Sequence, residues 1–214
     1  MKNEFLDTWN RSHLKHYHGV IAYDDWLEQE PFSSIISKSR GTFLDLGCGQ
    51  GNDTKYLIEN KKNVISCDLS NEALKILKDN FPSAKTIQAD MSEKLEFEDN
   101  KFDIIISDFS LQYFSKEKTE EIINELMRIV VPSGYLVLRL SSINDKNYGA
   151  LLGKKLENNY YYIEKRKKRF FDEKDIRYFF EKNWDILYLE EKHSKLERYD
   201  YERYYFEVLL RSKK

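Results

Sequence analysis

The stretch FLDLGCGQGND, residues 43–53, decides the fold predicted for this chain. A short apolar run leads into Gly47, Gly49 and Gly51, three of only eight glycines in the whole sequence. Such dense use of glycine predicts a turn that other residues could not easily adopt. A strand, a glycine turn and the start of a helix together form a turn that binds nucleotide-like ligands.

Short apolar runs and amphipathic stretches alternate beyond this turn. The runs predict five strands, and Ser70 is expected to cap the helix that follows the second of them. Strands alternating with helices favour right-handed crossovers and an α/β fold with a mostly parallel, doubly wound sheet that helices cover on both faces. The expected strands are Thr42–Leu46, Asn63–Cys67, Lys85–Ala89, Phe102–Ser107 and Tyr135–Leu140.

The C-terminal part departs from this alternation. A helix expected at 172–182 precedes two strands, 185–189 and 204–210, which a polar loop joins without a helix. Such strands form an antiparallel pair, which completes a Rossmann-like sheet of seven strands. We expect one domain, 1–214, made of a helical N-terminal cap (1–40), a cofactor-binding core (41–142), a variable insertion (143–170) and a C-terminal helix and strand pair (171–214).

Composition excludes several classes of protein. The 214 residues carry 35 basic and 37 acidic side chains, a balance that gives no support for nonspecific nucleic-acid binding. Aromatic residues make up 14% of the chain, which argues against global disorder. Two cysteines cannot form a disulfide framework, and no apolar run approaches the ~20 residues of a membrane span. The N-terminus lacks the apolar core of a signal peptide, so a cytoplasmic protein without a membrane partner is expected.

Asp45 distinguishes between two cofactor classes that use such a turn. A dinucleotide places an anionic pyrophosphate there and has the fingerprint G-x-G-x-x-G, whereas this chain has G-x-G-x-G. The carboxylate of Asp45, two residues before Gly47, would repel a pyrophosphate and attract a cation. S-adenosyl-L-methionine carries an ammonium and a sulfonium group and no phosphate, so charge favours it over a nicotinamide dinucleotide.

Two further acids follow neighbouring strands. Asp68 lies 21 residues after Gly47, at the end of the second expected strand, where a carboxylate can accept hydrogen bonds from both ribose hydroxyls. Asp90 ends the third strand and could accept a hydrogen bond from the adenine amino group. Together with Asp45, these acids are expected to converge on one crevice.

With these acids in register with five strands, the chain resembles the class I S-adenosylmethionine-dependent methyltransferases, especially the small cytosolic members of the methyltransferase-domain 11 and 25 type. The resemblance extends over residues 40–140. Ser133 departs from it, since a second glycine is common at that place in the turn before the fifth strand. The matching segments are FLDLGCGQGND (43–53), CDLS (67–70), QADM (88–91), FEDNKFDIIISDFSLQYF (97–114) and ELMRIVVPSGYLVLR (125–139).

The resemblance implies roles for individual residues. Asp45 and the glycine backbone would hold the methionyl end of S-adenosylmethionine, Asp68 the ribose and Asp90 the adenine. Residues 107–109, after the fourth strand, would border the sulfonium and the acceptor site. The cofactor-binding residues that we expect are Asp45, Gly47, Cys48, Gly49, Gly51, Asn52, Asp68, Leu69, Asp90, Met91, Ser107 and Phe109.

The sequence does not identify a general base. Asp108, His18 and Tyr113 are the candidates for taking a proton from an oxygen or nitrogen acceptor. No metal is expected, because the H-x-x-H-x-H pattern of His13, His16 and His18 matches no common zinc signature and has a surface or packing role as its simpler interpretation.

The predicted activity is methyl transfer to a small-molecule acceptor by in-line displacement, with S-adenosyl-L-homocysteine as product. The basic run Lys165–Arg169 leaves RNA or protein as alternative acceptors, although a solvated helix face is its simpler interpretation and a nucleic-acid partner is not expected. The missing base leaves a third alternative, a module that binds the cofactor without catalysis. The glycine spacing and Asp45 disfavour a nicotinamide oxidoreductase. Neither the acceptor atom nor the oligomeric state follows from the sequence.

Overall fold

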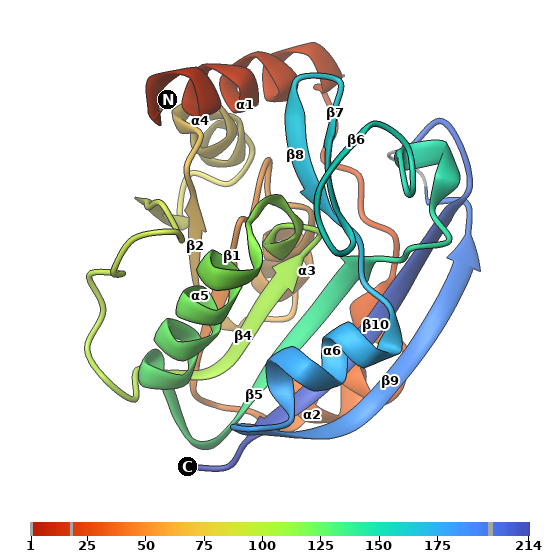
Figure 1. Ribbon diagram of the computed structural model, residues 1–214. Coiled ribbons are helices and arrows are strands. Elements are labelled where there is room, and N and C mark those ends of the chain that lie inside the picture. The colour runs from red at the N-terminus through yellow and green to blue at the C-terminus, as the bar shows by residue number, and fades with distance from the viewer. Residues whose placement is uncertain (1, 18, 197–198) are drawn as a thin grey trace.

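A seven-stranded sheet forms the centre of the computed structural model, which describes residues 2–17, 19–196 and 199–214. The strand order is β3-β2-β1-β4-β5-β10-β9, and the first five of these strands run parallel (Figure 1). β10 pairs antiparallel with β5 and β9, so the predicted Rossmann-like sheet with an antiparallel C-terminal pair is confirmed. The strands of this sheet are β1 Thr42–Leu46, β2 Asn63–Asp68, β3 Lys85–Gln88, β4 Phe102–Asp108, β5 Val130–Ser141, β9 Trp184–Ser194 and β10 Arg203–Ser212.

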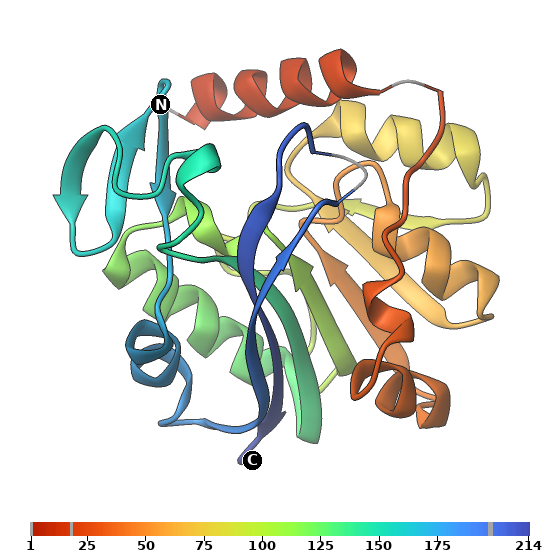
Figure 2. The same ribbon diagram turned by 90° about the vertical axis from the view of Figure 1, so that its right-hand side faces the viewer.

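Helices cover both faces of the sheet (Figure 2). α2, α3 and α4 lie on one face, and α5 and α6 lie on the other. Ser70, Ser115 and Asp172 cap α4, α5 and α6, because their side chains accept hydrogen bonds from backbone N–H groups of the first turn. The helices are α1 Lys2–His16, α2 Phe32–Lys38, α3 Asn52–Glu59, α4 Asn71–Asn80, α5 Lys116–Ile129 and α6 Glu173–Phe180, with 3-10 turns η1 Trp26–Glu28, η2 Leu111–Tyr113 and η3 Lys146–Tyr148.

The central parallel strands β1 and β4 are largely buried on both faces, as their apolar sequences predict. The three isoleucines of β4, residues 104–106, are each at most 1% exposed. Asp103 in the same strand accepts a hydrogen bond of 2.9 Å from the backbone N–H of Thr42, which ties β4 to the start of β1. Gly41 leaves room for this carboxylate, since a Cβ there would lie 1.8 Å from Asp103 Oδ2.

Some strand ends differ from the predicted ones. β5 begins at Val130, before the expected start, and contains the predicted turn as an irregularity. Ser133 at this irregularity has a φ of +58°, a left-handed conformation that favours glycine. β9 and β10 extend beyond their expected bounds, because their antiparallel pairing continues to Ser194 and Arg203.

Residues 143–170 contain a second, antiparallel sheet of three strands, β6 Lys154–Glu157, β7 Tyr160–Ile163 and β8 Arg166–Arg169. The expectation of a helix face at Lys165–Arg169 is therefore wrong. The tyrosines of β7 pair with this basic run, and aromatic residues favour strands. The charge pattern of the run alone contains no such signal.

α1 lies across the top of the molecule, between α4 and the three-stranded sheet (Figure 2). It is the first element of the N-terminal cap, which continues through η1 and α2. In this position α1 covers the carboxyl ends of the parallel strands. Among the helices of the described ranges, none is long and apolar enough to span a bilayer.

Candidate functional site

Acidic side chains end neighbouring parallel strands beneath α1. Asp68 is the last residue of β2 and Asp108 the last of β4, while Asp45 lies one residue before the end of β1, between them in the sheet. Asp90 follows β3. The strand order reverses between β1 and β4, and an open parallel sheet binds ligands at the carboxyl edge of such a point.

The glycine turn between β1 and α3 has a backbone that favours glycine. Gly47, Gly49 and Gly51 have φ angles of +73°, +53° and +96°. A Cβ on Gly51 would lie 2.4 Å from Leu77 Cδ1, and one on Gly47 would lie 2.4 Å from Ser110 Cβ. The dense glycines of the sequence thus have both a conformational and a steric cause.

Asp45 is only 1% exposed, and α3 holds its carboxyl from one side. Thr54 Oγ1 donates to Asp45 Oδ2 at 2.6 Å, and Ser66 Oγ lies 2.7 Å from the same hydroxyl. Burial raises the pKa of Asp45 to about 7, and the charges of Asp108 and Asp68 add to the shift. A cationic ligand group beside this carboxyl would favour its ionised form.

Asp68 is half-buried, and two backbone N–H groups fix its carboxylate. Gly49 N donates to Oδ2 and Ser70 N donates to Oδ1, each at 2.8 Å. Each carboxylate oxygen accepts more than one hydrogen bond, so these contacts leave capacity for ligand hydroxyls. The ribose contact expected of Asp68 is compatible with this geometry and stays a prediction.

Asp90 shapes the turn after β3. Ser92 N and Oγ both donate to Asp90 Oδ1, at 2.9 and 2.6 Å. Met91 reaches the glycine turn, because its Cε lies 3.1 Å from the position of a Cβ on Gly47. Leu69, at the start of the β2–α4 turn, is half-buried. The adenine contacts of these residues stay predictions.

α1 contributes contacts that the sequence analysis did not assign to the site. His13 Cε1 lies 3.2 Å from the position of a Cβ on Gly49, and the His13 carbonyl accepts a hydrogen bond of 2.9 Å from Gln50 Nε2. Ser70 Oγ donates to Asn10 Oδ1 at 2.7 Å. α1 therefore packs directly on the glycine turn and on the start of α4.

The segment after β4 also packs on the glycine turn. Phe109 has a φ of +50°, and Ser110 Oγ donates to the Leu46 carbonyl at 2.9 Å. Ser107 is fully buried, and its hydroxyl forms a hydrogen bond with that of Ser110. Residues after β4 thus lie against the glycine turn, and the contact expected between residues 107–109 and the cofactor stays a prediction.

Asp108 forms a bidentate pair with Arg139 of β5. Arg139 Nε and Nη2 donate to the two carboxylate oxygens at 2.7 and 2.8 Å, and Nη1 donates to Asp24 at 3.0 Å. Arg139 is fully buried, and its guanidinium carbon lies 4.5 Å from the ring centroid of Trp26. Both carboxylate oxygens are thus engaged by a buried guanidinium, so the geometry favours a positioning role for Asp108.

Tyr113, a second candidate base, ends η2 beneath α1. Its ring packs edge-to-face on Trp9 with centroids 4.8 Å apart, and its hydroxyl accepts a hydrogen bond of 3.2 Å from Gln112 Nε2. Burial raises the pKa of Tyr113, which disfavours the tyrosinate form at neutral pH. The third candidate, His18, lies outside the described residues.

Aromatic rings gather around Arg203, the first residue of β10. Its guanidinium carbon lies 4.1 Å from the ring centroid of Tyr148 and 4.4 and 4.6 Å from those of Tyr199 and Phe109. Asp145 neutralises the guanidinium through a contact of 2.8 Å. The rings therefore enclose a charge that is already paired.

Cys48 and Asn52 are two of the expected cofactor-binding residues, and both have contacts or surroundings that bear on this role. Cys48 is buried, and burial raises the pKa of its thiol well above the usual value, with Asp45 and Asp68 adding to the shift. A reactive thiolate is therefore disfavoured. The Asn52 side chain donates to the Ala22 carbonyl and ties α3 to the N-terminal cap. Over the described ranges, no three His, Cys, Asp or Glu side chains are grouped to bind a metal ion.

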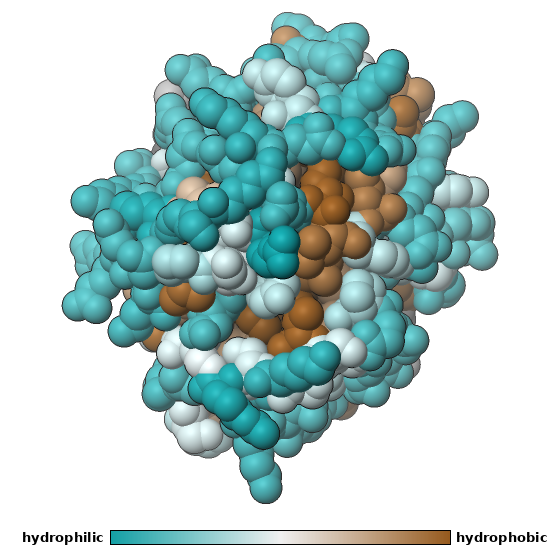
Figure 3. All heavy atoms as spheres, turned by 90° about the horizontal axis from the view of Figure 1, so that it is seen from below, coloured by the Kyte–Doolittle hydropathy of each residue, from teal (hydrophilic) through white to brown (hydrophobic). Residues whose placement is uncertain are grey.

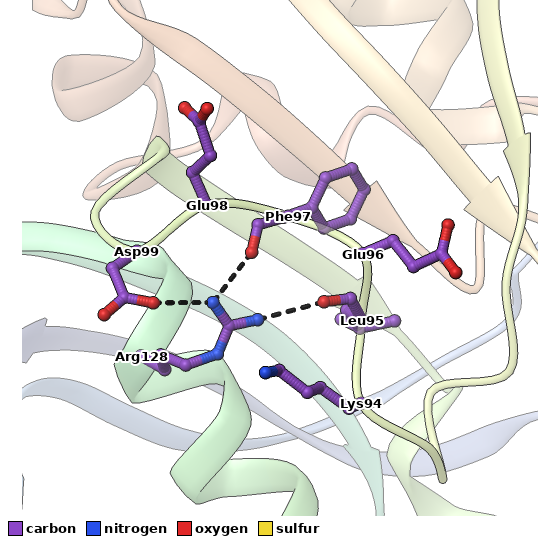
Figure 4. A pocket seen from close by; sticks show the side chains of 7 residues that line it. All are labelled: Lys94, Leu95, Glu96, Phe97, Glu98, Asp99 and Arg128. Atoms are coloured by element: carbon purple, nitrogen blue, oxygen red, sulfur yellow. Dashed lines mark hydrogen bonds and ion pairs between the residues drawn. The ribbon is translucent and has the colours of Figure 1, made fainter.

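A pocket at the opposite end of the sheet has a structural explanation. Seen from that end, a hydrophobic patch lies within a mainly hydrophilic surface (Figure 3). Residues 94–99 and Arg128 line the pocket, and Figure 4 shows the guanidinium pointing at this loop. Arg128 Nη1 donates to the Phe97 carbonyl and to Asp99, both at 2.7 Å, and Nη2 donates to the Leu95 carbonyl at 3.0 Å. The pocket thus marks where α5 anchors the β3–β4 loop.

Residues 44–138 match a family described as a methyltransferase domain. An uncharacterized methyltransferase of Synechocystis is 29% identical over 55% of this chain and 55% of its own. Phosphoethanolamine N-methyltransferase 1 of Triticum aestivum is 30% identical over 52% of this chain and 24% of its own. A tRNA N(3)-methylcytidine methyltransferase of Drosophila melanogaster is 28% identical over 74% of this chain and 52% of its own. The matches thus span about half the length of these relatives, or less.

Solved structures share the fold. A methyltransferase from Methanosarcina mazei that depends on S-adenosylmethionine has a TM-score of 0.75 at 20% identity, over 86% of this chain and 98% of that one. One from Clostridium acetobutylicum has a TM-score of 0.70 at 17% identity, over 99% of both chains. At such identities the likeness shows the fold. Residues 44–138 thus match a methyltransferase domain, and the chain shares the fold of methyltransferases that depend on S-adenosylmethionine.

Proposed function

We propose that this protein transfers the methyl group of S-adenosyl-L-methionine to a small-molecule acceptor, releasing S-adenosyl-L-homocysteine. The observation that carries the proposal is the set of carboxylates around the glycine turn, with Asp45 buried beside it. The matched methyltransferase domain and the shared fold support this cofactor, and the residues present fit it. The glycines leave space for close approach of a ligand to the backbone, and Asp68 retains acceptor capacity for hydroxyls.

The charge of this edge supports a cationic ligand. Arg139 pairs with Asp24 and Asp108, whereas Asp45 and Asp68 have no cationic partner among the described residues. A pyrophosphate would add negative charge to a site that is already acidic. An ammonium group would lower the cost of ionising Asp45 instead.

The residues of the chain would act mainly by positioning. When bound, the cofactor supplies an electrophilic methyl group. The glycine turn and Asp68 would fix the cofactor, and α1 would exclude water from the turn through His13 and Asn10. Holding the acceptor in line with the methyl group can supply as much as ~7–11 kcal/mol of the barrier. A base is required only for an acceptor that must lose a proton, and Asp108, Tyr113 and His18 stay candidates for it.

The alternative acceptor, RNA, is favoured by one observation. The insertion 143–170 has eight basic and three acidic residues within a chain of net charge −2. Exposed Tyr162 pairs with Lys154 and Lys167 across the three-stranded sheet, and an exposed ring between basic side chains suits a stacked base. One relative is named for a tRNA nucleotide and another for phosphoethanolamine, so the names of the relatives leave the acceptor class open.

Cofactor binding and turnover test these alternatives in two steps. We expect S-adenosylmethionine and S-adenosylhomocysteine, but not NAD, to raise the Tm. A ligand at ~100 times its Kd that binds only the folded state adds ~2.7 kcal/mol to the free energy of unfolding. Formation of S-adenosylhomocysteine is then measured with small-molecule fractions and with total tRNA. Turnover with small molecules supports our proposal, and turnover with tRNA that Lys154→Glu and Lys167→Glu abolish supports the alternative. Absence of any turnover with a bound cofactor would leave a non-catalytic module.

A further inference from the structure

We propose that the acceptor carries an anionic group, a carboxylate or a phosphate, and that Arg166 and Lys168 bind it; this inference rests on the proposed function. The two residues lie two apart in β8, so their side chains share one face of the strand. The guanidinium carbon of Arg166 lies 5.0 Å from the ring centroid of Trp9. Lys168 Nζ lies 4.8 Å from the centroid of Phe170 and 5.7 Å from that of Tyr148. This face is therefore turned toward α1 and η3.

Neither cation has a carboxylate within ion-pair distance among the residues that the structure describes. Lys168 Nζ donates only to a neutral group, the Tyr148 carbonyl, at 3.2 Å. The next residue of the strand behaves differently, because Arg169 pairs with Glu157 at 2.6 Å. Cations that are partly removed from water are costly without a counter-charge, so an anionic ligand would stabilise the pair.

The electrostatics of Lys168 point the same way. Burial lowers the pKa of Lys168 to about 7, and the charges of Arg203 and Arg166 add to the shift, while Asp145 and Glu164 oppose it. Strongly shifted groups are enriched at functional sites, and Lys168 lies among charged and aromatic side chains. An anion between the two side chains would offset the repulsion and favour the charged ammonium.

Aromatic rings in mutual contact connect the two cations to the end of β4. On one side, the Trp9 ring beside Arg166 packs on the ring of Tyr113 at the end of η2, with centroids 4.8 Å apart. On the other side, the Tyr148 ring beside Lys168 packs on the ring of Tyr199, with centroids 5.3 Å apart. The Tyr199 ring in turn packs on that of Phe109, the residue after β4, with centroids 5.9 Å apart. A planar acceptor could lie against these rings with its anionic group at the cations. The rings are Trp9 and Tyr113 on the first side, and Tyr148, Tyr199 and Phe109 on the second.

β8 also provides a matched control. Lys167 lies between the two cations in sequence, but it points to the opposite face, where it is exposed and pairs with Tyr162. Replacing Lys167 or Lys168 by methionine removes the same type of side chain from the same strand. A general effect of net charge would appear in both variants, whereas a bound anion affects only Lys168→Met.

The test measures binding of phenyl phosphate, benzoate and neutral benzamide to the full chain saturated with S-adenosylhomocysteine, by NMR titration. We expect both anions to bind more tightly than benzamide, and the tighter of the two identifies the anionic group. Arg166→Gln and Lys168→Met should each weaken anion binding about tenfold, as expected for the loss of a charge-assisted hydrogen bond, and Lys167→Met should not. Equal binding of anions and amide, or equal weakening by Lys167→Met, would overturn the proposal.

Two further measurements make the outcome unambiguous. Lys168→Arg keeps the charge and should retain most of the anion affinity, whereas a neutral Lys168 acting as a base would lose its role in that variant. Affinity for S-adenosylhomocysteine, measured on the same samples, separates the two proposals. If S-adenosylhomocysteine binds but the anions are not preferred over benzamide, only the anionic acceptor is refuted. If S-adenosylhomocysteine does not bind, the proposed function fails, and anion binding is then measured on the protein without S-adenosylhomocysteine.

Discussion

Lowering the pH from 8 to 6 should weaken the binding of S-adenosylhomocysteine about tenfold, through Asp45. The carboxyl of Asp45 has a pKa of about 7 in the free protein, because it is buried and lies near Asp108 and Asp68. The ligand's ammonium group favours the ionised form, so the pKa of Asp45 falls on binding. Molecules in which Asp45 carries a proton must therefore release it, and binding strengthens as the pH rises.

The magnitude follows from the protonated fraction of the free protein. With a pKa of about 7, roughly a tenth of the molecules carry the proton at pH 8 and roughly nine tenths at pH 6. If the pKa in the complex lies below ~5, the complex stays ionised throughout this range. The apparent Kd then rises about tenfold, which corresponds to ~1.4 kcal/mol.

Calorimetric titrations at pH 6, 7 and 8, each in two buffers of different ionisation enthalpy, measure both the affinity and the protons released. Asp45→Asn should bind more weakly at pH 8 and should lose the pH dependence. His13 lies against Gly49 and histidine titrates in the same range, so His13→Gln is the control and should keep the dependence. A pH dependence that survives in Asp45→Asn and disappears in His13→Gln would refute the reasoning.

Three further substitutions test other parts of the site. Asp68→Ala should weaken S-adenosylhomocysteine binding by at least ~1.5–3 kcal/mol in calorimetry, and an unchanged affinity would contradict the ribose assignment. Arg139→Met removes the buried guanidinium that pairs with Asp24 and Asp108, so urea denaturation should show a free energy of unfolding lower by about 3–5 kcal/mol; a wild-type value would contradict the buried network. Gly51→Ala places a Cβ against a leucine at a φ of +96° and should lower the Tm by several degrees, about 1 kcal/mol or more; an unchanged Tm would show that the turn relaxes.

The central sheet could be predicted because its signals are local. β1 has the predicted bounds, Thr42–Leu46, since an apolar run and a glycine turn define both the strand and its end. Ser70 could be predicted as a cap for the same reason, because the hydroxyl and the first turn of α4 are adjacent in sequence. The positions of Asp45, Asp68 and Asp108 at one edge then follow from the parallel order of the strands.

The buried ion pairs of Arg139 could not be predicted, because they join distant segments. Asp24 and Arg139 meet across 115 positions, and neither has a local pattern that marks a buried ion pair. The strand β8 in the basic run Lys165–Arg169 could not be predicted for the same reason. Its conformation depends on pairing with the tyrosines of β7 rather than on its own charges. α1 contacts the glycine turn and the start of α4 through His13 and Asn10, single side chains that no local pattern marks for this role.

The two sides of the site differ in charge, and this difference suits the proposed chemistry. In our proposals, Asp45 binds the ammonium of the cofactor, while Arg166 and Lys168 bind the anion of the acceptor. Each ligand would then be held by a charge of its own, and in these proposals the rings of Phe109 and Tyr113 border the reacting atoms. Methyl transfer from a sulfonium disperses positive charge in the transition state, so surroundings of low polarity stabilise the transition state relative to the charged reactants. Rings that border the transferring methyl group would therefore favour the reaction, and no acid is needed for a thioether that leaves uncharged.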